Sequence, residues 1–197
     1  MSRSGYTDYD DCDEDAEKNH EAWRKTVSES FKSKEGQTFL KEMLAAFDAL
    51  PQKRLIANVL QDAEWNEDGD KLVPVKDGDV CAFGAVGRMR GVEMPAELGL
   101  DDDDYDDEPY AEVQSLFGTD EHLTREIMYQ NDECDRGRRV PIPNVRRDNW
   151  DSWGYDILDE TPEERFIRMH KWIATRIKKE LPDSTGTDGE KAQGSSE

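Results

Sequence analysis

The densest group of chemically capable side chains in the sequence is a run of carboxylates at residues 101–108. Seven carboxylates fall within these eight residues, and one tyrosine interrupts them. Carboxylates this close repel one another, so they stay in water and cannot join a core. Such a run either aids solubility or imitates a phosphate backbone and binds a basic protein surface, with nearby tyrosines adding contact area. The candidate partner-binding residues are Asp101, Asp102, Asp103, Asp104, Tyr105, Asp106, Asp107, Glu108 and Tyr110.

A second group carries the opposite charge. Five arginines lie between positions 136 and 147, and two tryptophans follow them. Arginine binds phosphate and tryptophan stacks on bases, so this segment is an alternative, nucleic-acid-binding site. In a chain of net charge -21, pairing with the protein's own carboxylates is the simpler interpretation. The alternative set is Arg136, Arg138, Arg139, Arg146, Arg147, Trp150 and Trp153.

The remaining motifs do not favour catalysis. Residues 11–15 resemble the start of a calcium loop but lack its central glycine and its final glutamate. Residues 84–88 match neither a phosphate-binding loop nor a dinucleotide fingerprint, and no serine or cysteine stands in a nucleophile motif. Three widely spaced cysteines form neither a disulfide framework nor a zinc motif. We therefore expect a protein that is not an enzyme and has no metal site and no cofactor.

Composition limits the choice of partners. The chain has 197 residues, of which 26 are basic and 47 are acidic. A protein this acidic is repelled by nucleic acid and by anionic membranes, and it attracts basic proteins in a salt-dependent way. From residues 1–15, which are polar, we expect no signal peptide, and no apolar run approaches the roughly 20 residues that span a bilayer. We expect a cytoplasmic protein with no membrane contact, for which nucleic acid is an unlikely partner; the oligomeric state stays open.

These charged segments need elements that position them, and the apolar periodicity predicts helices for most of the chain. Apolar side chains recur at steps of three and four, the spacing of one helical face. The last predicted helix is marked most clearly, because Thr161, Pro162 and Glu164 combine an N-cap, a first-turn proline and a capping box. Helices are expected over residues 16–31, 39–50, 80–89 (ending at Gly91), 111–117, 120–131 (capped by Thr119) and 161–177.

The remaining segments predict a small hairpin, a long loop and two tails. The Asp68–Gly69 turn signal lies between apolar runs at 55–60 and 72–75, which indicates a β-hairpin. Residues 132–160 show no periodicity and are expected to form a long Arg-rich loop. The sequence thus predicts one mostly helical α+β domain. Its parts are an acidic disordered tail over 1–15, the domain over 16–181 with an acidic loop at 101–110, and a disordered tail over 182–197.

Four stretches resemble a group of uncharacterised tailed-phage and prophage proteins. They are Met1–Tyr6, Gly36–Leu44 followed by Leu50 and Pro51, Asp79–Gly87, and Glu160–Phe166. This group has no assigned activity, so the resemblance implies a genomic setting and supplies no catalytic residues. Small phage accessory proteins often bind host proteins, and acidic ones include inhibitors of restriction and CRISPR systems that imitate DNA.

Charge and resemblance lead to three hypotheses. The first is a non-enzymatic acidic phage protein that binds a basic, nucleic-acid-binding surface of a bacterial host or defence protein in the host cytoplasm. The second is a nucleic-acid-binding module that uses the Arg-rich loop. The third is a phage assembly or regulatory factor whose apolar surface, and not its charge, carries binding.

Overall fold

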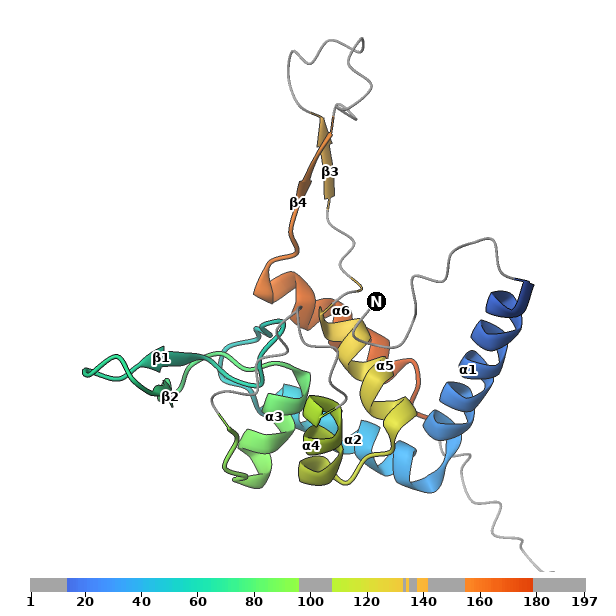
Figure 1. Cartoon of the computed structure of the whole chain (residues 1–197), viewed down its shortest axis with the longest axis horizontal. Coiled ribbons are helices and arrows are strands. Elements are labelled where there is room, and N and C mark those ends of the chain that lie inside the picture. The colour runs from blue at the N-terminus through green and yellow to red at the C-terminus, as the bar shows by residue number, and fades with distance from the viewer. Residues whose placement is uncertain (1–13, 96–107, 133, 135–137, 142–154, 179–197) are drawn as a thin grey trace, which may run out of the picture.

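The computed structural model describes residues 14–95, 108–132, 134, 138–141 and 155–178 of the chain. Helices account for 59% of the interpretable residues, which confirms a mostly helical α+β single domain. Two small antiparallel hairpins complete the described part, and both stand away from the helical body (Figure 1). The elements in chain order are α1 (Glu14–Lys32), α2 (Lys34–Ala49), β1 (Ala63–Trp65), β2 (Leu72–Pro74), α3 (Ala82–Arg90), α4 (Glu108–Phe117), α5 (Glu121–Asp132), β3 (Arg138–Pro141), β4 (Tyr155–Leu158) and α6 (Pro162–Ala174).

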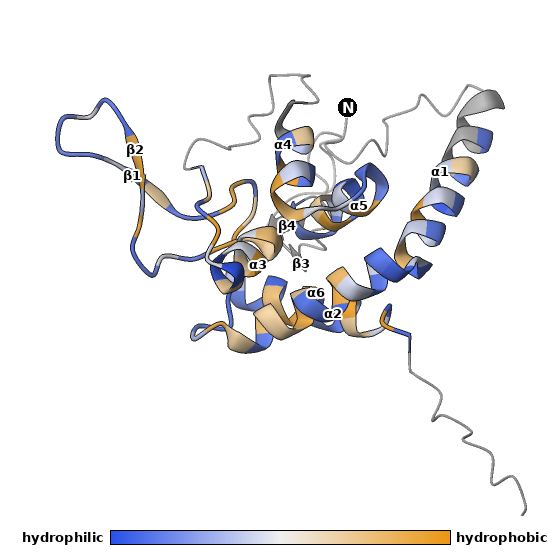
Figure 2. Cartoon of the chain, turned by 90° about the horizontal axis from the view of Figure 1, so that it is seen from below, coloured by the Kyte–Doolittle hydropathy of each residue, from blue (hydrophilic) through white to orange (hydrophobic). Residues whose placement is uncertain are grey.

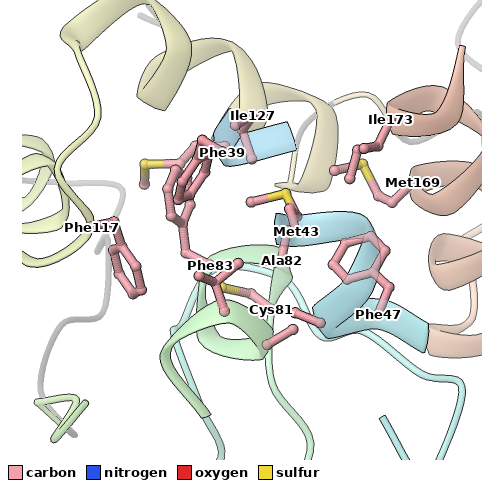
Figure 3. Packing of buried hydrophobic residues seen from close by; sticks show 14 of the residues in the cluster. Phe39, Met43, Phe47, Cys81, Ala82, Phe83, Phe117, Ile127, Met169 and Ile173 are labelled. Atoms are coloured by element: carbon pink, nitrogen blue, oxygen red, sulfur yellow. The ribbon is translucent and has the colours of Figure 1, made fainter. Parts of the chain in front are cut away.

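Helix α2 lies at the centre of the body and packs against α1, α3 and α6. The helix begins at Ser33, whose hydroxyl accepts a hydrogen bond from the Gly36 amide at 2.8 Å. Its apolar residues recur on one face, and Met43 and Phe47 of this face are fully buried (Figure 3). Burying each such side chain contributes about 1.5–3 kcal/mol, so this single face anchors the domain.

Aromatic rings join the helices around α2. Phe83 of α3 lies 5.6 Å from Phe39 and 5.1 Å from Phe117, measured between ring centroids. At the other end of α2, Phe47 lies 5.8 Å from Phe166 of α6. These tilted contacts connect four helices through one continuous apolar core (Figure 3).

Helix α3 confirms the predicted short helix that ends at Gly91. Gly91 has a φ of 68°, the left-handed conformation that glycine adopts without strain. The helix starts at Cys81, whose Sγ accepts from the Gly84 amide at 3.4 Å. All residues from Cys81 to Gly87 are buried, so α3 is a core helix and not an amphipathic surface helix.

Helix α6 has the predicted capping box, with Thr161 accepting from the Glu164 amide and Glu164 accepting from the Thr161 amide. Behind the cap, Arg168 forms a two-armed ion pair with Glu160 at 2.6 and 2.7 Å. Arg165 donates to the Leu55 carbonyl at 3.2 Å. The Arg165 contact ties the start of α6 to the loop after α2.

Three sequence predictions were wrong in detail. The cap of α5 is Asp120 and not Thr119, because the Asp120 carboxylate accepts from the Leu123 amide at 3.0 Å. The first strand of the predicted hairpin is Ala63–Trp65 and not residues 55–60, where Leu55 and Leu60 fill the core instead. Residues 132–160 are not one loop, since β3 and β4 pair within them.

No helix among the described residues is long and apolar enough to cross a membrane. The predicted tails lie almost entirely outside the described residues, except that helix α1 already begins at Glu14.

Candidate functional site

The β1–β2 hairpin is the most prominent projection built from described side chains (Figures 1 and 2). Its strands pair antiparallel with Ala63 opposite Pro74, Glu64 opposite Val73, and Trp65 opposite Leu72. Successive side chains of a strand point to opposite faces, so Trp65 and Leu72 share a face with Ala63 and Pro74. One face of the hairpin is therefore entirely apolar.

Trp65 dominates this apolar face. Its side chain is 63% exposed, whereas its cross-strand partner Leu72 is half-buried. Trp23 and Trp172, the other tryptophans whose side chains are described, both pack against the core, so an indole left this open to water is unusual in this protein. Large exposed aromatic surfaces that are framed by polar groups are typical of sites that bind another protein.

Carboxylates surround the tip of the hairpin. Glu64, Glu67, Asp68 and Asp70 are all exposed, and none of them forms an ion pair within the described part of the chain. Residues 62–79 contain seven acidic and two basic residues, so the projection carries strong negative charge. In Figure 2 the tip is hydrophilic, while apolar segments follow the strands. An apolar face with an acidic rim is complementary to a surface that is apolar and basic.

Asn66 holds the tip in shape. Its side-chain oxygen accepts from the backbone amides of Asp70 and Lys71 at 3.1 and 3.2 Å, and its side-chain nitrogen donates to the Asp70 carboxylate at 2.8 Å. Gly69 supplies the left-handed turn residue, with a φ of 71°. The acidic tip is thus a hydrogen-bonded turn, which reduces the backbone ordering that binding would require.

The base of the hairpin is anchored to the core. The Asp62 carboxylate accepts from the Asp79 amide at 2.8 Å, and Cys81 donates its amide to the Leu60 carbonyl at 3.1 Å. Leu60 and Val80 are both buried in the core. The hairpin therefore extends from a fixed base, which positions Trp65 relative to the helical body.

Most of the predicted acidic site lies outside the described residues. This holds for Asp101, Asp102, Asp103, Asp104, Tyr105, Asp106 and Asp107. Glu108 is the first residue of α4 and not part of a loop. Tyr110 is only 7% exposed, and the Arg125 guanidinium lies 4.4 Å from its ring. Tyr110 is thus a core residue, and its assignment to a contact surface was wrong.

The predicted arginine site is described only in part. Arg138 and Arg139 belong to β3, where they pair with Leu158 and Ile157 of β4. The other members, Arg136, Arg146, Arg147, Trp150 and Trp153, lie outside the described residues. The hairpin places two arginines on a projecting ribbon (Figure 1), and their side chains are not described.

Sequence reasoning missed Trp65, although the signal was present. The Asp68–Gly69 turn correctly indicated a hairpin, but the first strand was placed on the more apolar run at 55–60. The true strands lie at equal distances from the turn. They are Ala63-Glu64-Trp65 before it and Leu72-Val73-Pro74 after it.

Cys81, His122 and His170 have reactive side chains and make structural contacts. Burial raises the pKa of the Cys81 thiol to about 12, so it stays protonated and unreactive near neutral pH. His122 stacks on Trp23 with ring centroids 4.6 Å apart, and His170 contacts Asp48 at 3.0 Å. Within the described ranges, no group of three or more His, Cys, Asp or Glu side chains could hold a metal ion.

Comparisons with protein-family models, with curated proteins and with solved structures found no match to this chain. Its function must therefore be inferred from its own geometry.

Proposed function

We propose that this chain is a non-enzymatic binding protein that docks its acidic β1–β2 hairpin onto a basic surface of another protein. The observation that carries the proposal is Trp65, which is 63% exposed on an apolar face with an acidic rim. Tryptophan is enriched among the residues that dominate binding energy, because it buries a large rigid surface at little conformational cost. The surrounding carboxylates select partners of opposite charge and accelerate encounter.

The proposed partner is a protein whose basic surface normally binds nucleic acid. A basic surface that accepts a row of fixed carboxylates is of the kind that proteins use to bind nucleic acid. The resemblance to tailed-phage proteins favours a bacterial host or defence protein in the cytoplasm. The carboxylates at 101–107, which lie outside the described residues, are proposed to act in the same role.

The test is affinity capture from a bacterial lysate with matched variants. Trp65→Ala removes the apolar anchor, and Ile167→Ala on α6 removes an equally exposed side chain, at 66% exposure, from another face. Glu64→Gln, Glu67→Gln and Asp68→Asn together remove three of the four exposed carboxylates at the tip and give the tip-neutralised variant. Glu21→Gln, Glu29→Gln and Glu93→Gln remove the same charge from exposed sites elsewhere. Added duplex DNA then tests whether the captured surface binds nucleic acid.

We expect a basic protein to be retained by the wild type and by both control variants. Trp65→Ala and the tip-neutralised variant should lose it, since a buried tryptophan anchor contributes about 2 kcal/mol or more to binding. Duplex DNA should displace the partner from the wild-type protein. Retention by both hairpin variants would refute the proposed surface.

A second candidate function is nucleic-acid binding by the β3–β4 hairpin. A two-stranded ribbon that carries Arg138 and Arg139 and projects from the body is a shape that can follow a nucleic acid groove. A gel shift with single- and double-stranded DNA and RNA separates the two candidates. Binding that Arg138→Gln with Arg139→Gln abolishes favours this second function; the first predicts no shift.

A further inference from the structure

A cleft on a different part of the molecule carries the opposite charge from the hairpin. It has a volume of about 420 Å³ and lies between the inner face of α1, helix α5 and the turn that follows α6. Helix α1 contributes residues at steps of three and four from Arg24 to Lys32, with Val27 and Phe31 forming an apolar wall. Clefts of roughly 300–1,000 Å³ are typical of small-molecule sites.

Four cations line this cleft in a chain of net charge -21. Arg24, Lys32 and Lys178 form no ion pair with any described residue, although acidic residues far outnumber basic ones. The Lys178 ammonium donates to the Lys32 carbonyl at 2.8 Å, which holds it at the C-terminal end of α1. The Arg176 guanidinium stacks 4.0 Å from the centre of the Trp172 ring. Arg24, Lys32 and Lys178 thus lie around one opening without an ion-pair partner among the described residues.

Gln37 keeps these elements in register. Its side-chain nitrogen donates to the carbonyls of Phe31 and Arg176 at 2.6 and 3.0 Å. Its side-chain oxygen accepts from the Lys178 amide at 2.7 Å. One half-buried amide thus joins the end of α1 to the turn after α6, so the two sides of the cleft are fixed relative to each other.

Glu126 of α5 adds an unsatisfied acceptor to this lining. Its side chain is only 5% exposed, and Oε1 accepts from Gln130 at 3.1 Å. Oε2 is buried and has no hydrogen-bond partner. A buried acceptor without a partner destabilises the fold, and a ligand with a suitable donor would remove this penalty.

We propose that this cleft binds a mononucleotide. The ligand must carry an anionic group for Arg24, Lys32 and Lys178, and a hydrogen-bond donor for Oε2 of Glu126. It must also present a flat apolar surface to Val27 and Phe31. A phosphate, a ribose hydroxyl or base amine, and a base ring meet these three requirements in one molecule of suitable size. This site is separate from the hairpin and independent of the function proposed for it.

The proposal is tested by calorimetric titration of the full chain with AMP, GMP, CMP and UMP, with inorganic phosphate as the reference. Lys32→Gln removes a cation from the cleft, and Lys25→Gln makes the same change at an exposed position of α1 outside it. Glu126→Gln replaces one carboxyl oxygen by an amide nitrogen and keeps the shape. Thermal unfolding of each unliganded variant is measured in parallel.

We expect at least one nucleotide to bind tenfold or more tightly than inorganic phosphate. Lys32→Gln and Glu126→Gln should each weaken this binding about tenfold, and Lys25→Gln should leave it unchanged. Unliganded Glu126→Gln should unfold at no lower a temperature than wild type, so that its loss of binding is not a loss of the fold. Binding no tighter than phosphate, or an equal loss with Lys25→Gln, overturns the proposal.

Discussion

Gly84 is the residue at which the packing of α3 leaves least room. A Cβ added there would lie 1.9 Å from the Leu60 carbonyl oxygen, which is backbone and belongs to the base of the β1–β2 hairpin. A Cβ added at Gly87, one turn later, would lie 2.5 Å from Sδ of Met94, at the end of a flexible side chain. The two glycines therefore differ in what must move when a methyl group is added.

We predict that Gly84→Ala lowers the free energy of unfolding by about 1–3 kcal/mol, because backbone must shift to admit the methyl group. Gly87→Ala should cost clearly less, since Met94 can rotate away and alanine favours the helix by about 1 kcal/mol over glycine. Urea unfolding of both variants measures the difference. Equal losses would contradict the close approach of α3 to Leu60.

At the scale of elements, one ion pair joins α2 to α3. Arg90 donates to both oxygens of Glu42 at 2.6 Å, and it also donates to the Phe117 carbonyl at the end of α4 at 3.0 Å. The hydrogen bonds from Arg90 hold the pKa of the Glu42 carboxyl below its ordinary value of 4.5. A single guanidinium thus links the ends of α3 and α4 to the middle of α2.

We predict that this link stabilises the fold in a pH-dependent way. A carboxyl whose pKa is lowered in the folded state contributes stability above its ordinary pKa, and this contribution is lost as pH falls through the lowered folded value. Arg90→Gln should therefore destabilise the protein near neutral pH and much less in acid. Urea unfolding of wild type and variant across this range measures the gap, and a constant gap would contradict the linkage.

The capping box at the start of α6 gives a second prediction at this scale. Thr161→Ala removes the hydroxyl that accepts from the Glu164 amide, and should lower the free energy of unfolding by about 1 kcal/mol. Thr38→Ala, at an exposed position inside α2, should change it by a few tenths at most. Urea unfolding checks both. An equal effect at the two positions would show that the cap contributes nothing.

At the scale of the whole molecule, negative charge is the dominant property. With 47 acidic and 26 basic residues, the compact chain repels itself, and the cations near the basic cleft offset this only locally. Salt screens such repulsion, since the Debye length falls from about 30 Å at 0.01 M to about 8 Å at 0.15 M.

We predict that the urea midpoint of unfolding rises when salt is increased from about 0.01 M to about 0.15 M, because screening removes more repulsion from the compact state than from the expanded one. Binding of the partner proposed for the hairpin should weaken over the same range. Unfolding monitored at several salt concentrations checks the first effect, and a falling midpoint would show that attractive ion pairs dominate stability.

The sequence by itself determined the helices and most of the core. Apolar residues at helical spacing placed α2, the capping box at Thr161 placed α6, and Gly91 marked the end of α3. These signals are local, because a cap or a helical face depends on residues only a few positions apart. The Asp68–Gly69 turn is also a local signal, and the sequence predicted the hairpin turn from it.

Only the tertiary structure decided which residues meet. Tyr110 follows a run of carboxylates in sequence, yet it is buried beside Arg125, while Trp65 is left exposed. Residues 55–60 look like a strand, but Arg165 and Asn131 bind their backbone and Leu55 and Leu60 fill the core. The basic cleft joins α1, α5 and the turn after α6, which are far apart in the chain. Periodicity describes one segment at a time, whereas burial and site geometry depend on how distant segments pack.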